Sequence, residues 1–195
     1  IVDWVNQGCA EGDSSKGDFD VPKSSNWQLP KDPDLEVFIS ETEVDVPESG
    51  PPNLRNFVVE TRLDSSRLAG AIEIRPSNRK VVQHASVYAI PPGLARAYPS
   101  VRNLLGTPEL LANLIAWYSP DCPPRIYPED MARELPAGSK LIFQILYRPT
   151  GRAERDRTSV GLVWADPAKA TRLVRTIPIA ATQLTISSGR PIVSV

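Results

Sequence analysis

His84 is the only histidine of the chain, and histidine is the side chain best suited to bind a metal or move a proton near neutral pH. It lies in Val81–Ile90, where Val, Ile, Tyr and small residues predict a buried strand that Pro91–Gly93 end abruptly. A metal centre needs about three or four protein ligands. His84 therefore holds a metal only with partners from elsewhere. Without them, we expect it to pack half-buried with one ring nitrogen bonded to the backbone.

The two cysteines, Cys9 and Cys122, are the next candidates for chemistry. They are too few for a disulfide scaffold, and they do not form a Cys-x-x-Cys pair of the kind that binds zinc or exchanges disulfides. In an oxidising compartment they can form one bridge that joins the N-terminal arm to a later loop. Two unpaired thiols are the alternative, and the sequence leaves both open.

The remaining candidate side chains fit structural roles better. Met131 is the only methionine, and we expect it in a loop or in the core. Glu129 and Asp130 are adjacent in a predicted loop, where a solvated pair is expected rather than a glycosidase site. Trp164 is expected in the core, although an exposed aromatic side chain on a strand can bind sugar. The sequence contains no nucleophile elbow, phosphate loop or dinucleotide fingerprint.

Composition limits the classes of protein to consider. The 195 residues are 41% hydrophobic and carry a formal net charge of -1, which predicts one globular domain with a tail and argues against a nucleic-acid partner. The 20 prolines favour short strands and loops over long helices. No apolar run approaches the roughly 20 residues of a membrane-spanning helix, so no membrane span is expected. Because the chain starts at Ile1 without a leader, we expect a mature form or a fragment.

Residues 1–33 are predicted to form an N-terminal arm and linker, separate from a domain over residues 34–195. One or two helical turns are expected at the start, ending near Gly8. A stretch rich in Ser, Asp, Lys and Pro follows, which is typical of linkers. Trp27 and Leu29 are expected to anchor this arm on the domain.

Partial alternation and frequent turn signals predict that the domain consists of short strands. The predicted strands are Leu35–Ser40, Glu43–Val46, Phe57–Arg62, Gly70–Arg75, Lys80–Ile90, Lys140–Tyr147, Thr158–Trp164, Thr171–Pro178 and Gln183–Ser187. One helix is predicted over Thr107–Tyr118, because Thr107 can cap it, Pro108 suits its first position and apolar residues recur on one face. This pattern predicts an all-β fold, an antiparallel β-sandwich with one short helix.

Several stretches of the sequence resemble a known family. They are Ile74–His84 with Pro91–Gly93, Leu135–Gly151 with Asp156–Leu162, and the shorter stretches Ile1–Asp13, Trp27–Leu29 and Pro33–Asp34. The long blocks resemble the N-terminal domain of copper type II, ascorbate-dependent monooxygenases, the peptidylglycine hydroxylating and dopamine β-monooxygenase class, in its bacterial, cytochrome-c-linked branch. The opening stretch is similar to the last helix of a cytochrome c-like domain, and the other short stretches are similar to the linker that follows it.

The resemblance implies a jelly-roll-like β-sandwich whose copper relays electrons to a second domain, where oxygen and substrate react. In the family, two adjacent histidines on one strand and a third on a later strand hold this first copper. Three imidazoles suit copper in both of its oxidation states. The resemblance also implies a periplasmic or secreted location, which permits a Cys9–Cys122 bridge. The implied partners are neighbouring cytochrome c-like and second monooxygenase domains of the parent protein.

In this chain the implied ligand set is incomplete. Gln83 stands at the first position, His84 matches the second, and Leu146 occupies the third. Leucine cannot coordinate a metal and an amide oxygen is poorly matched to Cu(I), so we expect no bound copper. In a regular strand Gln83 and His84 point to opposite faces. Both can approach one ion only at a bulge or at an edge.

The family's catalytic half is not evident either. After Pro178 the sequence has none of the histidines and methionine that this half supplies. The resemblance therefore implies the N-terminal domain of a monooxygenase-like protein, with a degenerate copper site and without activity as this chain. The alternative is a structural or docking β-sandwich that arranges a neighbouring heme or catalytic domain. A carbohydrate-binding module is a weaker alternative, which rests on fold analogy alone. Substrate and oligomeric state stay open.

Overall fold

The computed structural model describes residues 2–8 and 27–179. Its strands are β1 (Leu35–Phe38), β2 (Val44–Val46), β3 (Asn53–Glu60), β4 (Arg67–Arg75), β5 (Val82–Ile90), β6 (Leu114–Tyr118), β7 (Arg125–Ile126), β8 (Met131–Leu135), β9 (Lys140–Tyr147), β10 (Glu154–Asp156), β11 (Ser159–Trp164) and β12 (Arg172–Leu173). Its helices are α1 (Val2–Asn6), α2 (Pro92–Ala97), α3 (Val101–Leu104) and α4 (Pro108–Ala112).

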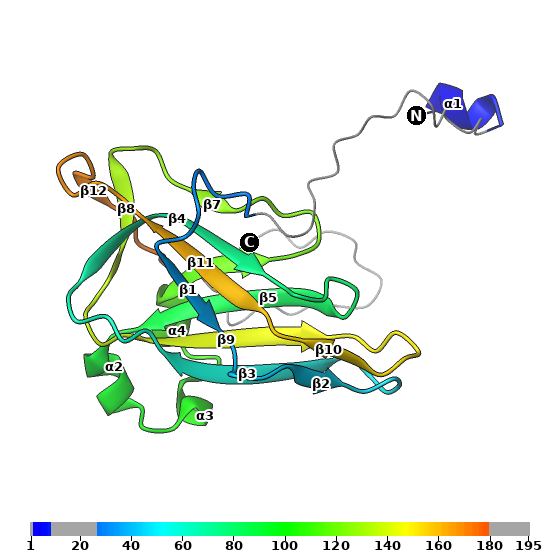
Figure 1. The fold of residues 1–195 in the computed structure, drawn as a ribbon, viewed down its shortest axis with the longest axis horizontal. Coiled ribbons are helices and arrows are strands. Elements are labelled where there is room, and N and C mark those ends of the chain that lie inside the picture. Colours follow the sequence, from blue (N-terminus) through cyan, green and yellow to red (C-terminus); the bar gives the residue numbers. More distant parts are fainter. Residues whose placement is uncertain (1, 9–26, 180–195) are drawn as a thin grey trace, which may run out of the picture.

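Two sheets make up the sandwich (Figure 1). The first runs β1-β11-β4-β8-β12, with β7 also paired to β4, and the second runs β3-β9-β5-β6. β2 and β10 form a separate two-stranded ladder. Strand pairs are antiparallel except for β8 and β12, which are parallel. The predicted all-β, antiparallel β-sandwich is therefore confirmed.

The inward-facing side chains of both sheets form one hydrophobic core. Ile72 and Leu162 come from the six-stranded sheet, and Val87, Phe143 and Ile145 come from the four-stranded sheet; all are fully buried. Along β9 every second residue faces this core, as expected for a strand with one buried face. Each such side chain contributes about 1.5–3 kcal/mol on leaving water, so the two inner faces hold the sandwich together.

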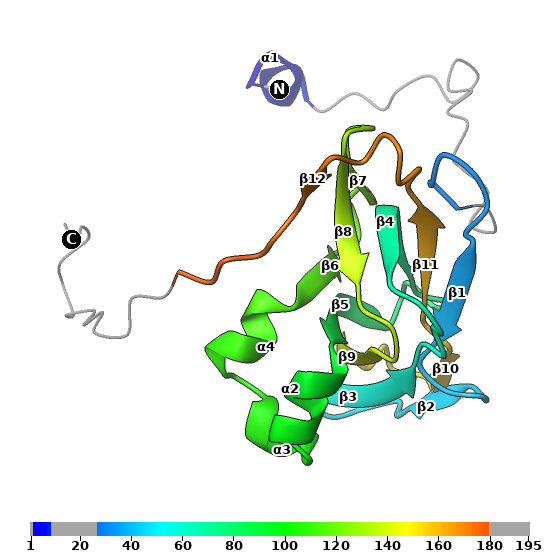
Figure 2. The same cartoon turned by 90° about the vertical axis from the view of Figure 1, so that its left-hand side faces the viewer.

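Helices α2, α3 and α4 cover one end of the outer face of the four-stranded sheet (Figure 2). Leu104 and Leu110 pack there with Tyr88 of β5 and Ile142 of β9. Within residues 27–179, no helix covers the rest of that outer face. None of the helices within residues 2–8 and 27–179 has the length and apolar character needed to cross a bilayer.

The described end of the N-terminal arm packs on the outer face of the six-stranded sheet. Leu29 is buried there, with Trp27 beside it. The Trp27 ring lies over Gly161, where a Cβ atom would come within 2.7 Å of the ring. The Gln28 backbone N–H donates a hydrogen bond of 2.7 Å to Glu73 Oε2. The predicted anchoring by Trp27 and Leu29 is thus confirmed.

The helix predicted over Thr107–Tyr118 is wrong in its second half. The Thr107 hydroxyl does cap α4, since it accepts a hydrogen bond of 3.2 Å from the Leu110 N–H. The helix ends at Ala112, however, and Leu114–Tyr118 form β6, which pairs with β5. The branched and aromatic side chains of this segment favour a strand, and pairing with β5 places some of them in the core.

Most other strand predictions differ from the structure only at their ends. Lys140–Tyr147 has the predicted bounds, whereas the predicted strand over Thr171–Pro178 is reduced to β12. Strands β7, β8 and β10 and helices α2 and α3 were not predicted. Helix α1 ends before Gly8, whose φ of 85° allows the chain to turn there, as the sequence indicated. The predicted strand Gln183–Ser187 lies outside the described residues.

Candidate functional site

Strand β5 is bulged at the predicted ligand positions. Val82 pairs with Tyr147 of β9 and His84 pairs with Leu146, so Gln83 is an extra residue between two consecutive pairs. Two residues opposite one define a β-bulge. The three positions that the sequence marked as ligand positions are therefore neighbours in the structure.

His84 is exposed, and no hydrogen bond to its ring is found in the part of the chain that the structure describes. The prediction of a half-buried histidine bonded to the backbone is thus wrong. Val82 faces the core, and strict alternation would place His84 on the same face. The extra residue in the bulge instead turns His84 outward.

The side chains around the bulge offer few metal donors. Gln83 supplies one amide and His84 one imidazole, whereas Leu146 supplies none. On the next strand, Leu54 lies opposite Leu146 and is 55% exposed. Within residues 27–179 no group of three or more His, Cys, Asp or Glu side chains lies close enough together to hold a metal ion. The residues at these positions do not fit a copper held by three imidazoles.

Met131 and Cys122, the sulfur-containing residues that the structure describes, do not lie at the bulge in β5. Met131 begins β8 of the six-stranded sheet, so it is not brought to the bulge on the four-stranded sheet. Cys122 is half-buried in the loop after β6, with its thiol 3.5 Å from the Pro123 carbonyl oxygen. Cys9 lies outside the described residues, so the Cys9–Cys122 bridge stays a prediction.

Glu129, Asp130 and Trp164 make contacts that fit structural roles. The Glu129 carboxylate lies 2.6 Å from Lys169 Nζ, and Asp130 forms an ion pair with Arg172. These side chains are largely exposed, so Glu129 and Asp130 form the solvated pair that the sequence predicted. Trp164 is half-buried against the core, also as predicted.

A polar row crosses the four-stranded sheet next to His84. Asn56, Gln144, Ser86 and Trp117 lie side by side on β3, β9, β5 and β6. The Tyr88 hydroxyl donates to Gln144 Oε1 at 2.9 Å, and Gln144 Nε2 donates to Asn56 Oδ1 at 3.1 Å. Burial raises the pKa of Tyr88, so its hydroxyl stays protonated and donates at neutral pH. These bonds fix the Gln144 amide, while Trp117 is 48% exposed.

The polar row belongs to a larger surface without charged side chains, here called the open face. It consists of Leu54, Asn56, Val58, His84, Ser86, Trp117, Gln144 and Leu146. None of these residues is Asp, Glu, Lys or Arg, although those types make up 23% of the chain. Leu54, Val58 and Trp117 are each about half exposed. An exposed surface with several large apolar side chains is typical of an interaction site.

Sequence reasoning missed the open face. Trp117 was assigned to the helix predicted over residues 107–118 and not to a strand. Leu54 lies before the start predicted for its strand. A signal was present, because Ile115 and Trp117 belong to a branched and aromatic run that ends at Pro120. That run favours a strand, but regular alternation would place Trp117 on the same face as the buried Ile115. The register shift between β5 and β6 separates the two side chains.

Fold and site together define an antiparallel β-sandwich whose four-stranded sheet has an exposed outer surface, the open face, made of uncharged residues. No protein-family model matches the chain, and a search of curated proteins finds no match. An assignment to a family therefore depends on the residues and on the geometry of β5 and β9.

Proposed function

We propose that the chain is an N-terminal-type domain of the copper type II, ascorbate-dependent monooxygenase group that has lost its copper site and acts as a docking module. The observation that carries the proposal is the bulge at Gln83 and His84 opposite Leu146. Two adjacent strand residues can approach one ion only at an edge or where an extra residue in a bulge breaks the alternation of faces. This bulge lies where the resemblance requires two adjacent ligands.

The residues at the bulge are better suited to contact a partner's surface than to coordinate a metal ion. Copper that cycles between Cu(I) and Cu(II) is held by imidazole or sulfur ligands, which an alkyl group and an amide do not replace. Leu54 and Leu146 instead offer apolar surface, which stabilises a contact by roughly 25 cal/mol per Å² buried. The partner that fits is neutral and largely apolar at its contact surface.

The partner we propose is the second β-sandwich domain of a parent protein, which the resemblance implies. A cytochrome c-like domain, joined through the N-terminal arm, is the second implied neighbour. The same resemblance supports a periplasmic or secreted location. In this role the chain supplies no reacting group, and its contribution is to hold two neighbours in place.

Copper titration tests the loss of the metal site. The purified chain is loaded with Cu(II), desalted and assayed by metal analysis and electron paramagnetic resonance, beside His84→Ala. The proposal predicts substoichiometric copper that the substitution does not change. One copper per chain that is lost in His84→Ala would contradict it.

Quenching of Trp117 fluorescence by acrylamide tests the docking role. Trp117 is 48% exposed, and the difference between the natural chain and Trp117→Phe isolates its signal. The proposal predicts ready quenching in this chain and protection in the longer parent polypeptide. Equal quenching in both would exclude docking at the open face.

A carbohydrate-binding module is the second candidate, because Trp117 lies at the end of the row of Ser86, Gln144 and Asn56. An aromatic face beside amides and a hydroxyl offers stacking and hydrogen bonds to a neutral sugar. Titration with cellohexaose and mannohexaose, followed by calorimetry, tests this function. Binding that is lost in Trp117→Ala but kept in Leu173→Ala would favour it over docking.

A further inference from the structure

A second candidate site lies on the outer face of the six-stranded sheet. It is a hollow of about 650 Å³ between the N-terminal arm, β1, the turn after β4 and the start of β11. The residues used here are Glu36, Phe38, Arg75, Arg79, Lys80 and Arg157, and the hollow is called the basic groove. It lies on the other sheet from the open face, so it is independent of the function proposed above.

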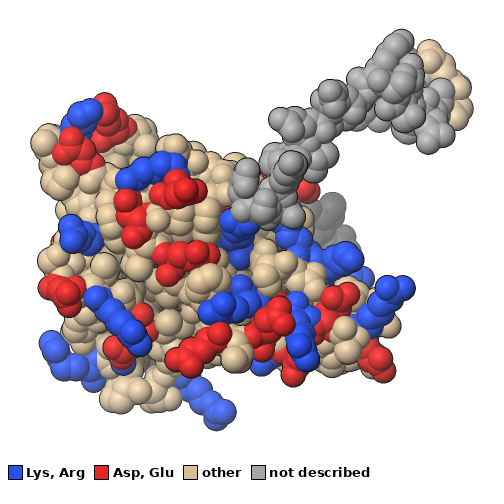
Figure 3. Space-filling view, viewed as in Figure 1, with Lys and Arg blue, Asp and Glu red and all other residues tan. Residues whose placement is uncertain are grey.

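Positive charge dominates the lining of the basic groove. Four cations and one carboxylate, Glu36, line it, and Glu36 Oε1 accepts a hydrogen bond of 2.8 Å from the Ser159 hydroxyl. Outside the lining, the Glu73 carboxylate lies close enough to Arg75 and Arg79 for their charges to lower its pKa. Across residues 27–179, no ion pair involves Arg79, Lys80 or Arg157. Figure 3 shows Lys and Arg side chains on this part of the surface, with Asp and Glu side chains among them. An excess of cations in a hollow raises the local concentration of anions.

The turn that presents Arg79 and Lys80 is held in place by hydrogen bonds to the side chain of Asp156. Asp156 is fully buried, and its Oδ1 accepts hydrogen bonds of 3.1 and 3.2 Å from the backbone N–H groups of Ser77 and Asn78. Asn78 Oδ1 in turn accepts a bond of 3.1 Å from the Lys80 N–H. A turn that is already ordered loses little conformational entropy when a ligand binds.

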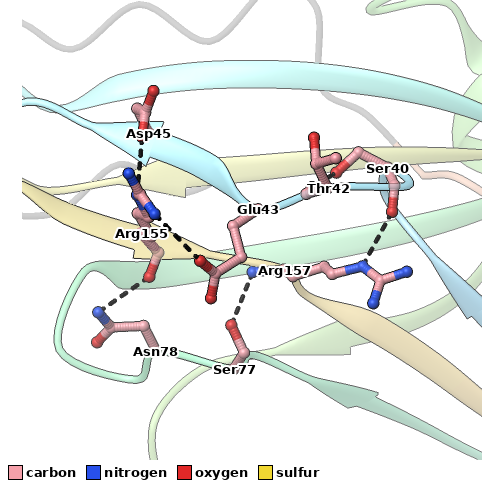
Figure 4. Close-up of polar contacts among 8 residues, drawn as sticks. All are labelled: Ser40, Thr42, Glu43, Asp45, Ser77, Asn78, Arg155 and Arg157. Atoms are coloured by element: carbon pink, nitrogen blue, oxygen red, sulfur yellow. Dashed lines mark hydrogen bonds and ion pairs between the residues drawn. The ribbon is translucent and has the colours of Figure 1, made fainter.

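Arg157 is also fixed in place. Its guanidinium lies 4.0 Å from the centre of the Phe38 ring. Its Nε donates to the Ser40 carbonyl at 3.1 Å, and its backbone N–H donates to Ser77 Oγ at 2.7 Å. Figure 4 shows both hydrogen bonds and shows the two terminal nitrogens making no bond to the other residues drawn. Those terminal N–H groups are oriented donors for a ligand.

We propose that the basic groove binds the phosphate or sulfate group of an anionic ligand. Arginine and lysine make charge-assisted hydrogen bonds to such oxygens, and the planar guanidinium contacts two oxygens at once. Arg157 provides the fixed guanidinium, and Arg79 and Lys80 provide charge from the rigid turn. Glu36 repels the anion and limits the affinity, which makes its removal diagnostic.

Isothermal titration calorimetry of the full chain at low ionic strength tests the proposal. The probes are inorganic phosphate and sulfate, followed by glucose 6-phosphate and glucose 6-sulfate, which show which ester is preferred. We expect one saturable site that Arg79→Gln/Lys80→Gln weakens about tenfold or more. Glu36→Gln, which keeps an acceptor for Ser159, should bind several-fold more tightly because the repulsion is gone.

The control is Arg96→Gln/Arg102→Gln, which changes the net charge equally at exposed positions on α2 and α3. It should bind the probes like the natural chain. Amide chemical shifts should change at residues 77–80 on titration. Absence of saturable binding, equal weakening by the control, or no effect of Glu36→Gln would each overturn the proposal. These substitutions are at exposed positions, so their folding is readily checked by thermal denaturation.

Discussion

The two outer faces of the sandwich differ in charge and in what covers them. The outer face of the six-stranded sheet carries charged residues such as Glu73 and Arg75, and Trp27 of the chain's own arm packs on it. The open face is the part of the outer face of the four-stranded sheet that carries no Asp, Glu, Lys or Arg, and Leu54 and Trp117 there are about half exposed. The Glu60–Lys140 ion pair lies beyond Val58, at the end of the same side of the sheet.

This difference indicates separate roles for the two faces. A covered face contributes to folding, because its side chains leave water when the chain folds. An uncharged face left in water contributes little to folding and fits a partner. Matched substitutions on the two faces should therefore have unequal effects on stability.

The largest effect is expected from shortening Leu29. It is 9% exposed on the covered face, and Leu29→Ala should lower the free energy of unfolding by about 2–3 kcal/mol. The matched substitution is Leu54→Ala on the open face, where a 55% exposed side chain should cost at most about 0.5 kcal/mol. Urea denaturation measures both, and equal losses would show that the faces do not differ.

Gly161→Ala should have the next largest effect. Its Cβ would meet the Trp27 ring at 2.7 Å and Pro33 Cβ at 3.1 Å, so the arm must shift, at a cost of about 1–3 kcal/mol. In a Trp27→Ala background most of this cost should disappear. A double-mutant cycle tests the contact. If the cost were unchanged without the Trp27 ring, the arm would not be the cause.

Glu73, on the outer face of the six-stranded sheet, should make the free energy of unfolding depend on pH. Burial raises the pKa of this carboxyl, although the Gln28 N–H and Arg75 oppose the shift. The folded chain therefore keeps this proton to higher pH than the unfolded chain. The free energy of unfolding should fall as pH rises above about 4.3, the usual value for Glu.

Glu73→Gln should remove this part of the pH dependence. Denaturation of both chains at several values between about pH 4 and pH 7 measures the difference. Parallel stability curves for the natural chain and the variant would contradict the expectation.

The smallest effect is expected at Trp117. Because its ring is 48% exposed, Trp117→Ala should change the melting temperature little, by an amount that corresponds to less than about 1 kcal/mol. The same variant should no longer bind a partner that contacts the open face. Loss of folding in Trp117→Ala would show that this ring belongs to the core instead.

Elements that follow a single local pattern were predictable, and those that depend on pairing were not. Lys140–Tyr147 is a nearly continuous run of apolar and aromatic residues that favour a strand, and its predicted bounds agree with the structure. The apolar spacing over Thr107–Tyr118 fits a helix, but an available edge of β5 converts its second half to a strand. Which edge is available is a property of the whole fold and cannot be read from the local sequence.

The candidate site shows the same limit. The sequence identified Gln83, His84 and Leu146 through the resemblance, and it indicated that adjacent ligands need a bulge. It did not show that a bulge exists, because an inserted residue leaves no local mark in a run such as Val81–Ala85. The exposure of His84 follows from that bulge, so the prediction of a half-buried ring was wrong.

The most direct test of the account is to restore the missing histidines. In Gln83→His/Leu146→His the bulge should place three imidazoles together, and metal analysis should find about one copper per chain. The control Asn56→His/Trp117→His adds as many histidines at opposite ends of the polar row. The account predicts stoichiometric copper only in the first variant, with loss on adding His84→Ala. A folded first variant that binds no more copper than the control would contradict it.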